Sequence, residues 1–131
     1  MYSPSIIKVG FVILGGAFGT AFRYMIAAAA YHHFGAKFPW GTLWVNLIGC
    51  FVIGLLWGSF EKIYLSTTMK AFFFIGILGG FTTFSSFAME SFNLFRSDFK
   101  LALLNIIIHN VGGIALAAAG YGLILFLIAR Y

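Results

Sequence analysis

The stretch GILGGFTTFSSFAMESF, residues Gly76 to Phe92, places glycines, hydroxyl residues and a carboxylate inside an otherwise apolar part of the chain. Gly79 and Gly80 weaken a helix, because glycine loses more backbone freedom on ordering than any other residue. The threonines and serines that follow can bond the backbone groups that a broken helix frees. We therefore predict a membrane helix that breaks here, with unpaired carbonyls on one side of the break and unpaired amides on the other.

The composition of the chain indicates a lipid environment. Of its 131 residues, 62% are hydrophobic and 8% are charged, whereas a soluble chain carries about a quarter charged residues. The net charge is +5, but the lysines and arginines are scattered singly and form no stripe that could follow phosphates, so we exclude nucleic-acid binding. The single Cys50 matches no metal-binding spacing, and we expect it to pack as a small hydrophobe.

Four windows are long and apolar enough to cross a bilayer, which takes about 20 residues. We predict a single all-α transmembrane domain over residues 1–131. Its helices are expected at about residues 6–30, 41–60, 71–95 and 101–129, joined by connections at 32–40, 61–70 and 96–100. The first window also resembles a secretory signal peptide, but we interpret it as a membrane helix. Glycines four residues apart, such as Gly15 with Gly19 and Gly54 with Gly58, favour close helix packing in lipid.

The positive charges near the predicted helix ends set no orientation. An excess of lysine and arginine on cytoplasmic loops orients a membrane protein. The predicted spans place Lys8, Lys62, Lys70 and Arg130 on one side, and Arg23, Lys37, Arg96 and Lys100 on the other. A chain with four positive charges on each side can insert both ways. We hypothesise a dual topology, in which two copies of opposite orientation form an antiparallel homodimer with the symmetry of an inverted repeat.

Polar side chains at membrane depth are costly and usually face a bundle interior or a water-filled path. Asn46 lies one turn after Thr42, and its amide either bonds another helix or points at an ion. Arg23, near the end of the first window, either snorkels to the interface or attracts anions to a vestibule. Asn105 and His109 share one face of the fourth helix, where they either join helices or offer N–H groups to an anion.

Two phenylalanines in the stretch from Gly76 to Phe92 also have two interpretations. Phe84 and Phe87 are three residues apart and share a helix face, which is typical of core packing. The positive edge of a phenyl ring can also coordinate an anion weakly, and conduction requires binding that is favourable without being tight. Glu90, which follows them, has no role that the sequence defines.

Four segments of the chain resemble the Fluc/CrcB family of small bacterial fluoride channels. They are GGAFGTAFRY at residues 15–24, WGTLWVNLIGCFVIG at 40–54, GGFTTFSSF at 79–87 and HNVGGIALAAAG at 109–120. They cover all four predicted helices, and the order of the second and third segments is highly specific. The resemblance implies a fluoride-selective channel in the bacterial inner membrane, which exports cytoplasmic fluoride passively and protects against its toxicity. It also implies an antiparallel dimer with two fluoride pathways.

The resemblance assigns roles to individual positions. It implies a structural Na⁺ at the dimer interface, held by the main-chain carbonyls of Gly79 and Thr82, with Arg23 as the arginine at the end of the first helix. Asn46 matches the pore asparagine, and Phe84 and Phe87 match the pore phenylalanines. The fluoride pathway that we predict is lined by Thr42, Asn46, Thr83, Phe84, Ser85, Phe87, Asn105 and His109.

The fourth helix departs from the pattern that the resemblance implies. Asn105 stands where a tyrosine is expected, and His109 and Gly113 stand where serines are expected. Asn105 and His109 are plausible substitutes because both carry N–H donors. The residues that line the far end of the pore therefore stay open.

The main alternative is a small multidrug-type, proton-coupled exporter, which is also a four-helix protein of dual topology. Such export requires a carboxylate deep in the first span, and this chain has no acidic residue before Glu61. A non-transporting subunit of a larger complex would explain the packing glycines but not the ordered motifs. We expect no enzyme, because three acids and scattered histidines form no catalytic constellation.

Overall fold

The computed structural model describes residues 5–130, and four of its helical stretches are long and apolar enough to cross a bilayer, as the sequence predicts. The elements are α1 (Ile6–Phe34), α2 (Trp40–Lys62), α3 (Thr67–Lys70), η1 (Ala71–Leu78), α4 (Gly79–Phe81), α5 (Phe84–Ser97), α6 (Phe99–Ile107), η2 (Ile108–Gly112) and α7 (Gly113–Ile128). The third span runs from α3 to α5, and the fourth from α6 to α7. Within them, η1 and η2 are wider, π-helical turns.

The connections are shorter than the sequence predicts, because polar residues cap the helices directly. Asp98 ends α5, and its carboxylate accepts hydrogen bonds from two N–H groups of α6 at 3.0 and 3.1 Å. The turn predicted over residues 96–100 is therefore a single residue. Ser66 caps α3 in the same way. At the first connection, α1 continues to Phe34, and the chain then turns at Gly35, whose φ of 75° favours glycine.

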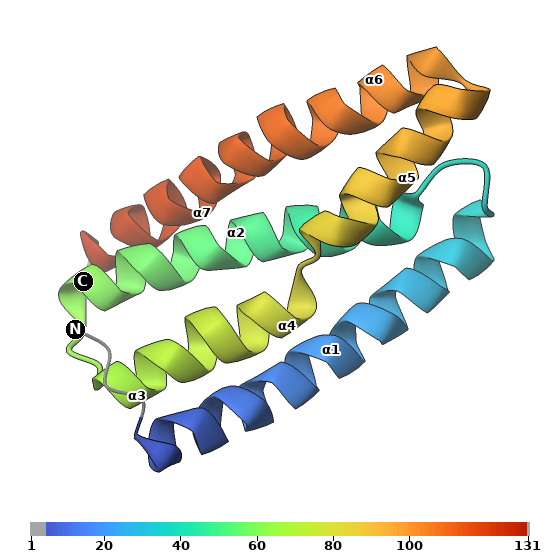
Figure 1. Ribbon diagram of the computed structural model, residues 1–131. Coiled ribbons are helices and arrows are strands. Elements are labelled where there is room, and N and C mark those ends of the chain that lie inside the picture. The colour runs from blue at the N-terminus through green and yellow to red at the C-terminus, as the bar shows by residue number, and fades with distance from the viewer. Residues whose placement is uncertain (1–4, 131) are drawn as a thin grey trace.

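Close backbone contacts join α1 to the first half of the third span and α2 to α7 (Figure 1). A Cβ atom on Gly15 would lie 2.7 Å from the Phe72 carbonyl oxygen. One on Gly54 would collide with the carbonyl oxygen of Ala117. Neither backbone could approach so closely past a larger residue. The packing role predicted from the glycine spacing is confirmed at these positions.

The third span breaks at the predicted place. Thr82 (φ −82°, ψ 159°) and Thr83 (φ −149°, ψ 114°) are extended and separate α4 from α5. Figure 1 shows a short non-helical link after α4, beyond which α5 is displaced from the axis of α4. The half before the break packs on α1, and α5 packs mainly on α6. The break therefore moves the polar half of the span away from the glycine-packed half.

The ends of the bundle carry similar positive charge. The start of α1, the end of α7 and the connection from α2 to α3 lie at one end, and the other two connections lie at the opposite end (Figure 1). The first end holds Lys8, Lys62, Lys70 and Arg130, and the second holds Lys37, Arg96 and Lys100. Arg23 was placed near a helix end in the prediction. Because α1 extends to Phe34, Arg23 instead lies within the helix, beside the break.

Candidate functional site

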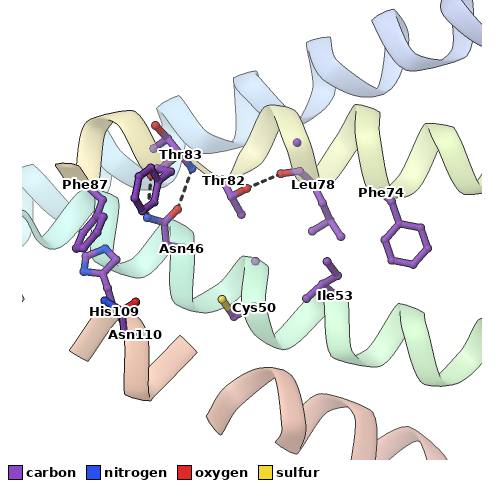
Figure 2. A pocket seen from close by; sticks show the side chains of 13 residues that line it. Asn46, Cys50, Ile53, Phe74, Leu78, Thr82, Thr83, Phe87, His109 and Asn110 are labelled. Atoms are coloured by element: carbon purple, nitrogen blue, oxygen red, sulfur yellow. Dashed lines mark hydrogen bonds between the residues drawn. The ribbon is translucent and has the colours of Figure 1, made fainter. Parts of the chain in front are cut away.

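Asn46, on α2, bonds both backbone groups of Thr83 at the helix break (Figure 2). Its Nδ2 donates to the Thr83 carbonyl oxygen at 3.0 Å, and its Oδ1 accepts from the Thr83 N–H at 2.9 Å. In an unbroken helix, that N–H would bond the carbonyl of Gly79, four residues earlier. Asn46 therefore satisfies the groups that leave the helix and deprives the Gly79 carbonyl of its intrahelical partner.

The hydroxyl residues of the break bond the chain locally. Thr82 Oγ1 donates to the Leu78 carbonyl oxygen at 2.9 Å, at the end of α4. Thr83 Oγ1 caps α5 by accepting from the Ser86 N–H at 3.2 Å. The Thr83 cap confirms the prediction that hydroxyl groups rebond freed backbone, whereas the Leu78 carbonyl still accepts from the Thr82 N–H as in a helix. The exposed Ser85 lies with its hydroxyl 3.4 Å from that of Thr83.

A cavity of about 350 Å³ opens beside the break, between α2, the third span and η2 (Figure 2). Of the predicted pathway residues, those that line it are Asn46, Thr83, Phe84, Phe87 and His109. Thr42, Ser85 and Asn105 do not line it. Among the residues that the structure describes, no lysine or arginine forms part of its wall. The cavity is thus apolar, with a few N–H and hydroxyl groups.

The two phenylalanines beside this cavity differ in burial. The rings of Phe84 and Phe87 lie 5.5 Å apart between centroids. Phe87 is 9% exposed, and its ring packs on that of His109 at 4.4 Å with an interplanar angle of 39°. Phe84 is 77% exposed. One ring is therefore held within this copy of the chain, and the other is presented outward.

Asn105 lies behind the cavity wall, fully buried between α6 and α5. Its Nδ2 donates to the Ser91 hydroxyl at 3.0 Å, and its main-chain carbonyl oxygen lies 3.0 Å from His109 Nδ1. The structure therefore places His109 at the cavity, whereas Asn105 joins two helices and orients the His109 ring. Asn110 also lines the cavity, but its amide donates to the Ile106 carbonyl oxygen of its own helix at 2.7 Å.

A second cavity, of about 470 Å³, lies between the α1–α2 connection and α5. Thr42 and Glu90 line it, and Thr42 Oγ1 donates to Glu90 Oε1 at 2.8 Å. Within the described chain, the buried Glu90 Oε2 has no hydrogen-bond partner. Thr42 precedes Asn46 by one turn on α2, and Glu90 follows Phe87 by one turn on α5. Both cavities therefore border α2 and α5, and the Thr42–Glu90 bond lies at the second cavity.

Arg23 brings a positive charge to the break from α1. Its Nη1 donates to the Thr82 carbonyl oxygen at 3.4 Å, so the guanidinium lies against the main chain and not in bulk water. A cation at this position attracts anions toward the break. Arg23 therefore lies half-buried inside α1, beside the break, and not at the end of the helix.

Comparison with known proteins identifies the family. Residues 10–121 match the family described as CrcB-like protein, Camphor Resistance (CrcB). The chain belongs to the CrcB family. A relative from Parabacteroides distasonis, named fluoride-specific ion channel FluC, is 43% identical over 120 residues, covering 91% of this chain and 92% of the relative. Proteins of the same name from Solidesulfovibrio magneticus (42% identical, covering 88% and 94%) and Aquifex aeolicus (41%, covering 84% and 90%) are also similar.

These relatives confirm the resemblance found in the four sequence segments. They are named as ion channels, and this CrcB-family chain has four helices of membrane-spanning length and apolarity. We conclude that it is a multi-pass membrane protein.

The break also offers oxygen ligands for a cation in this CrcB-family chain. The described residues contain no group of three or more His, Cys, Asp or Glu side chains that could hold a metal. The Gly79 carbonyl, which has lost its intrahelical partner to Asn46, fits the main-chain ligation of Na⁺ at an unwound helix. The Thr82 carbonyl accepts from the Arg23 guanidinium at 3.4 Å and keeps a second lone pair for a cation.

Three features of the site were not predicted from the sequence. Thr42 and Glu90 are 48 residues apart, and no local pattern links them. Ser91 was not considered, although it receives the Asn105 amide. The π-helical turn η2, which carries His109, was not predicted, because no residue pattern in the sequence indicated a π-helix there. Such turns occur often at functional sites, because they redirect side chains within a helix.

Proposed function

We propose that this chain is a fluoride-specific ion channel that exports cytoplasmic fluoride passively across the bacterial inner membrane. The observation that carries the proposal is the helix break bonded by Asn46, which opens on a cavity of ring edges and N–H groups without lysine or arginine in its wall. Fluoride is small and strongly hydrated, so a pore must replace its water with donors and still release the ion. The names of the relatives support the same function.

The fluoride path runs along α2 and α5, through the two cavities that share these helices. Asn46 and Phe87 lie at the first cavity, and Thr42 and Glu90 at the second. Arg23, against the break, raises the local concentration of anions without lining either cavity. An inside-negative membrane potential then drives the anion outward, and this export protects the cell.

The functional unit is an antiparallel homodimer of dual topology. The ends of the bundle hold four and three positive charges, counting Lys8, Lys62, Lys70 and Arg130 against Lys37, Arg96 and Lys100, so neither orientation is favoured. The outward ring of Phe84 is available to a second copy. Two antiparallel copies bring their helix breaks to the same depth, where the carbonyls of Gly79 and Thr82 from both hold the structural Na⁺.

The alternative of a proton-coupled multidrug exporter receives no support from the first span. The ionisable side chain at depth in α1 is Arg23, a permanent cation that cannot exchange a proton with a substrate. The titratable carboxylate in the spans near the cavities, Glu90, lies on α5.

The proposal is tested with the purified chain in liposomes, by measuring fluoride and chloride efflux with an electrode when Na⁺ is present. We expect rapid fluoride efflux and no chloride efflux above that of protein-free liposomes. Absence of fluoride efflux, or equal efflux of both ions, would contradict the channel. Replacing Na⁺ by a large organic cation during purification tests the structural ion, and we expect loss of flux that added Na⁺ restores.

A further inference from the structure

A third cavity, of about 380 Å³, lies where the end of α2 meets the start of the third span. Trp57 and Phe60 of α2 line it, together with Phe74 of η1. The Phe74 ring makes edge contacts with Trp57 at 5.7 Å and with Phe60 at 5.5 Å between centroids. Trp57 is 58% exposed, so this aromatic recess opens to the surroundings of the bundle. It shares Phe74 with the cavity beside the break but none of that cavity's polar residues.

Two opposite charges, Glu61 and Lys70, also line the recess, and both side chains are exposed. Tyr121 of α7 donates its hydroxyl hydrogen to Glu61 Oε2 at 2.9 Å, which positions the carboxylate. Within the described chain, Glu61 and Lys70 form no ion pair with each other, although they face the same cavity. The recess therefore presents a negative and a positive charge separately, beside aromatic rings.

Both charges lie at the level of the lipid headgroups. Glu61 is in the last turn of α2, and Lys70 is in the first turn of the third span. The connection between these two helices lies at one end of the bundle (Figure 1). In a membrane protein the ends of the spans meet the headgroup layer, where tryptophan and positive side chains concentrate. The recess therefore faces lipid headgroups at high local concentration.

A smaller, uncharged cavity of about 250 Å³ adjoins the recess, and Trp57 lines both. Its other lining residues include Ile53 of α2 and Ala117 of α7. These lie one turn deeper in the membrane than Trp57 and Tyr121, because α2 and α7 both end at this end of the bundle. The charged recess thus lies above an apolar one, in the order in which a phospholipid presents its headgroup and its hydrocarbon chain.

We propose that this recess binds an ethanolamine phospholipid, whose headgroup carries one phosphate and one primary ammonium group. The ammonium donates to the Glu61 carboxylate and lies against the aromatic rings, while Lys70 pairs with the phosphate. A quaternary ammonium has no N–H to donate, so a choline headgroup binds less well. A glycerol headgroup has no cation and brings a net negative charge toward Glu61, which repels it. The site is independent of the proposed fluoride conduction.

The test is native mass spectrometry of the purified chain in detergent, with equal amounts of ethanolamine, choline and glycerol phospholipids that carry the same acyl chains. We expect the chain to retain the ethanolamine lipid about threefold to fivefold more than either of the others, which corresponds to one exposed charge pair. Lipids that only coat the apolar surface would be retained equally, because their acyl chains are identical.

Two variants and one matched control assign the contacts. In Glu61→Gln, the ratio of ethanolamine to choline lipid should fall to about one, because the carboxylate selects the primary ammonium. Lys70→Gln should lower the retention of the ethanolamine lipid itself about threefold, since its partner is the phosphate. Lys62→Gln is the control, because Lys62 is an exposed lysine beside Glu61 that does not line the recess. It should retain lipids as the unaltered chain does.

Equal retention of the three lipids, preference for the glycerol lipid, or a preference that survives in Glu61→Gln overturns the site. If Glu61→Gln and Lys70→Gln lose their oligomeric state in detergent without lipid, the recess is a contact between copies of the chain, and the lipid site is rejected. Should the variants fail to fold, the unaltered protein decides with N-methylated ethanolamine lipids. Retention must fall as methyl groups replace the N–H groups, and an unchanged retention rejects the inference. Fluoride efflux is measured separately, so none of these outcomes affects the channel.

Discussion

The two halves of the third span are built in opposite ways. Before the break, η1 and α4 pack on α1 through glycines, with backbone against backbone. After it, α5 carries phenyl, hydroxyl and carboxyl groups and borders two cavities. Of the buried side-chain atoms that lack a partner in the described residues, one lies on α5, at Glu90, and the others lie on the fourth span, at Asn105 and His109. One half is closed by contact, and the other keeps polar groups available.

This difference shows how a small helical membrane protein can hold a polar site in lipid. Backbone contacts between glycines contain no side chain that can change rotamer, so they locate the break firmly. The reciprocal bonds between Asn46 and Thr83 then set the direction in which α5 leaves. Glu90 on α5 is thus free of the helix packing that the glycines provide, and one of its carboxylate oxygens has no partner in the described residues.

The largest effect is expected when a side chain is added to a glycine of the glycine-packed half. A Cβ atom on Gly19 would collide with the carbonyl oxygen of Ile77 and lie 2.8 Å from the Phe81 backbone nitrogen. Backbone atoms cannot move aside as a side chain can, so we expect Gly19→Ala to cost more than about 3 kcal/mol, at or beyond the upper end for overpacking. Size-exclusion chromatography should show little assembled protein, and fluoride efflux should be lost.

The matched control is Gly10→Ala on the same helix. Nothing in the described chain lies within 4 Å of a Cβ atom built at Gly10. Assembly and flux should be normal, with a small gain in helix stability from the replacement of glycine. Equal behaviour of the two variants would show that glycine packing does not locate the break.

The second prediction concerns the hydrogen bonds of Asn46 to Thr83, which hold the two halves of the third span at the break. Asn46→Ala leaves the N–H and the carbonyl of Thr83 without their partners, at about 1–3 kcal/mol for each buried group. We expect a fluoride flux lower by at least about tenfold, since 1.4 kcal/mol corresponds to a factor of ten. Asn110→Ala is the control, because that amide lines the same cavity but bonds its own helix. A larger loss in Asn110→Ala would contradict the structural role of Asn46.

The third prediction compares the roles of the Phe84 and Phe87 rings on α5. Phe84→Ile and Phe87→Ile remove ring edges but keep apolar bulk, so each should lower fluoride flux several-fold while the proposed dimer remains intact by chromatography. Phe87→Ile should also lower the melting temperature, by a cost under about 1.5 kcal/mol, because Phe87 is the buried ring that packs on His109. Normal flux in both variants would show that the rings only pack.

The glycine-packed half could be predicted from the sequence more fully than the polar half. Four-residue glycine spacing and a Gly-Gly pair before hydroxyl residues are local signals, and both the close helix contacts and the break follow from them. The length of α1 was underestimated, because the polar residues after Ala30 suggested a loop although the helix continues to Phe34. That error placed Arg23 at a helix end.

The polar half depends on pairs that are distant in sequence. Asn46 and Thr83 are 37 residues apart, and Asn105 bonds Ser91 across two helices. A sequence identifies each of these as a polar residue at membrane depth, but the partner is set by how α2, α5 and α6 pack. For that reason Asn105 was predicted in the fluoride path, while the structure places it behind the cavity. Its role in conduction stays a prediction.

The smallest expected effect concerns the bond between Thr42 and Glu90 at the second cavity. Thr42→Val keeps the shape of the side chain and removes the hydroxyl that donates to Glu90 Oε1. The carboxylate loses its one hydrogen bond within the described chain, at a cost of about 1 kcal/mol. Thermal unfolding of Thr42→Val, Glu90→Gln and the double variant measures the coupling. Because Gln can still accept from Thr42 but carries no charge, part of the coupling should persist in Glu90→Gln. Strict additivity would show that the charge of Glu90 contributes nothing to its bond with Thr42.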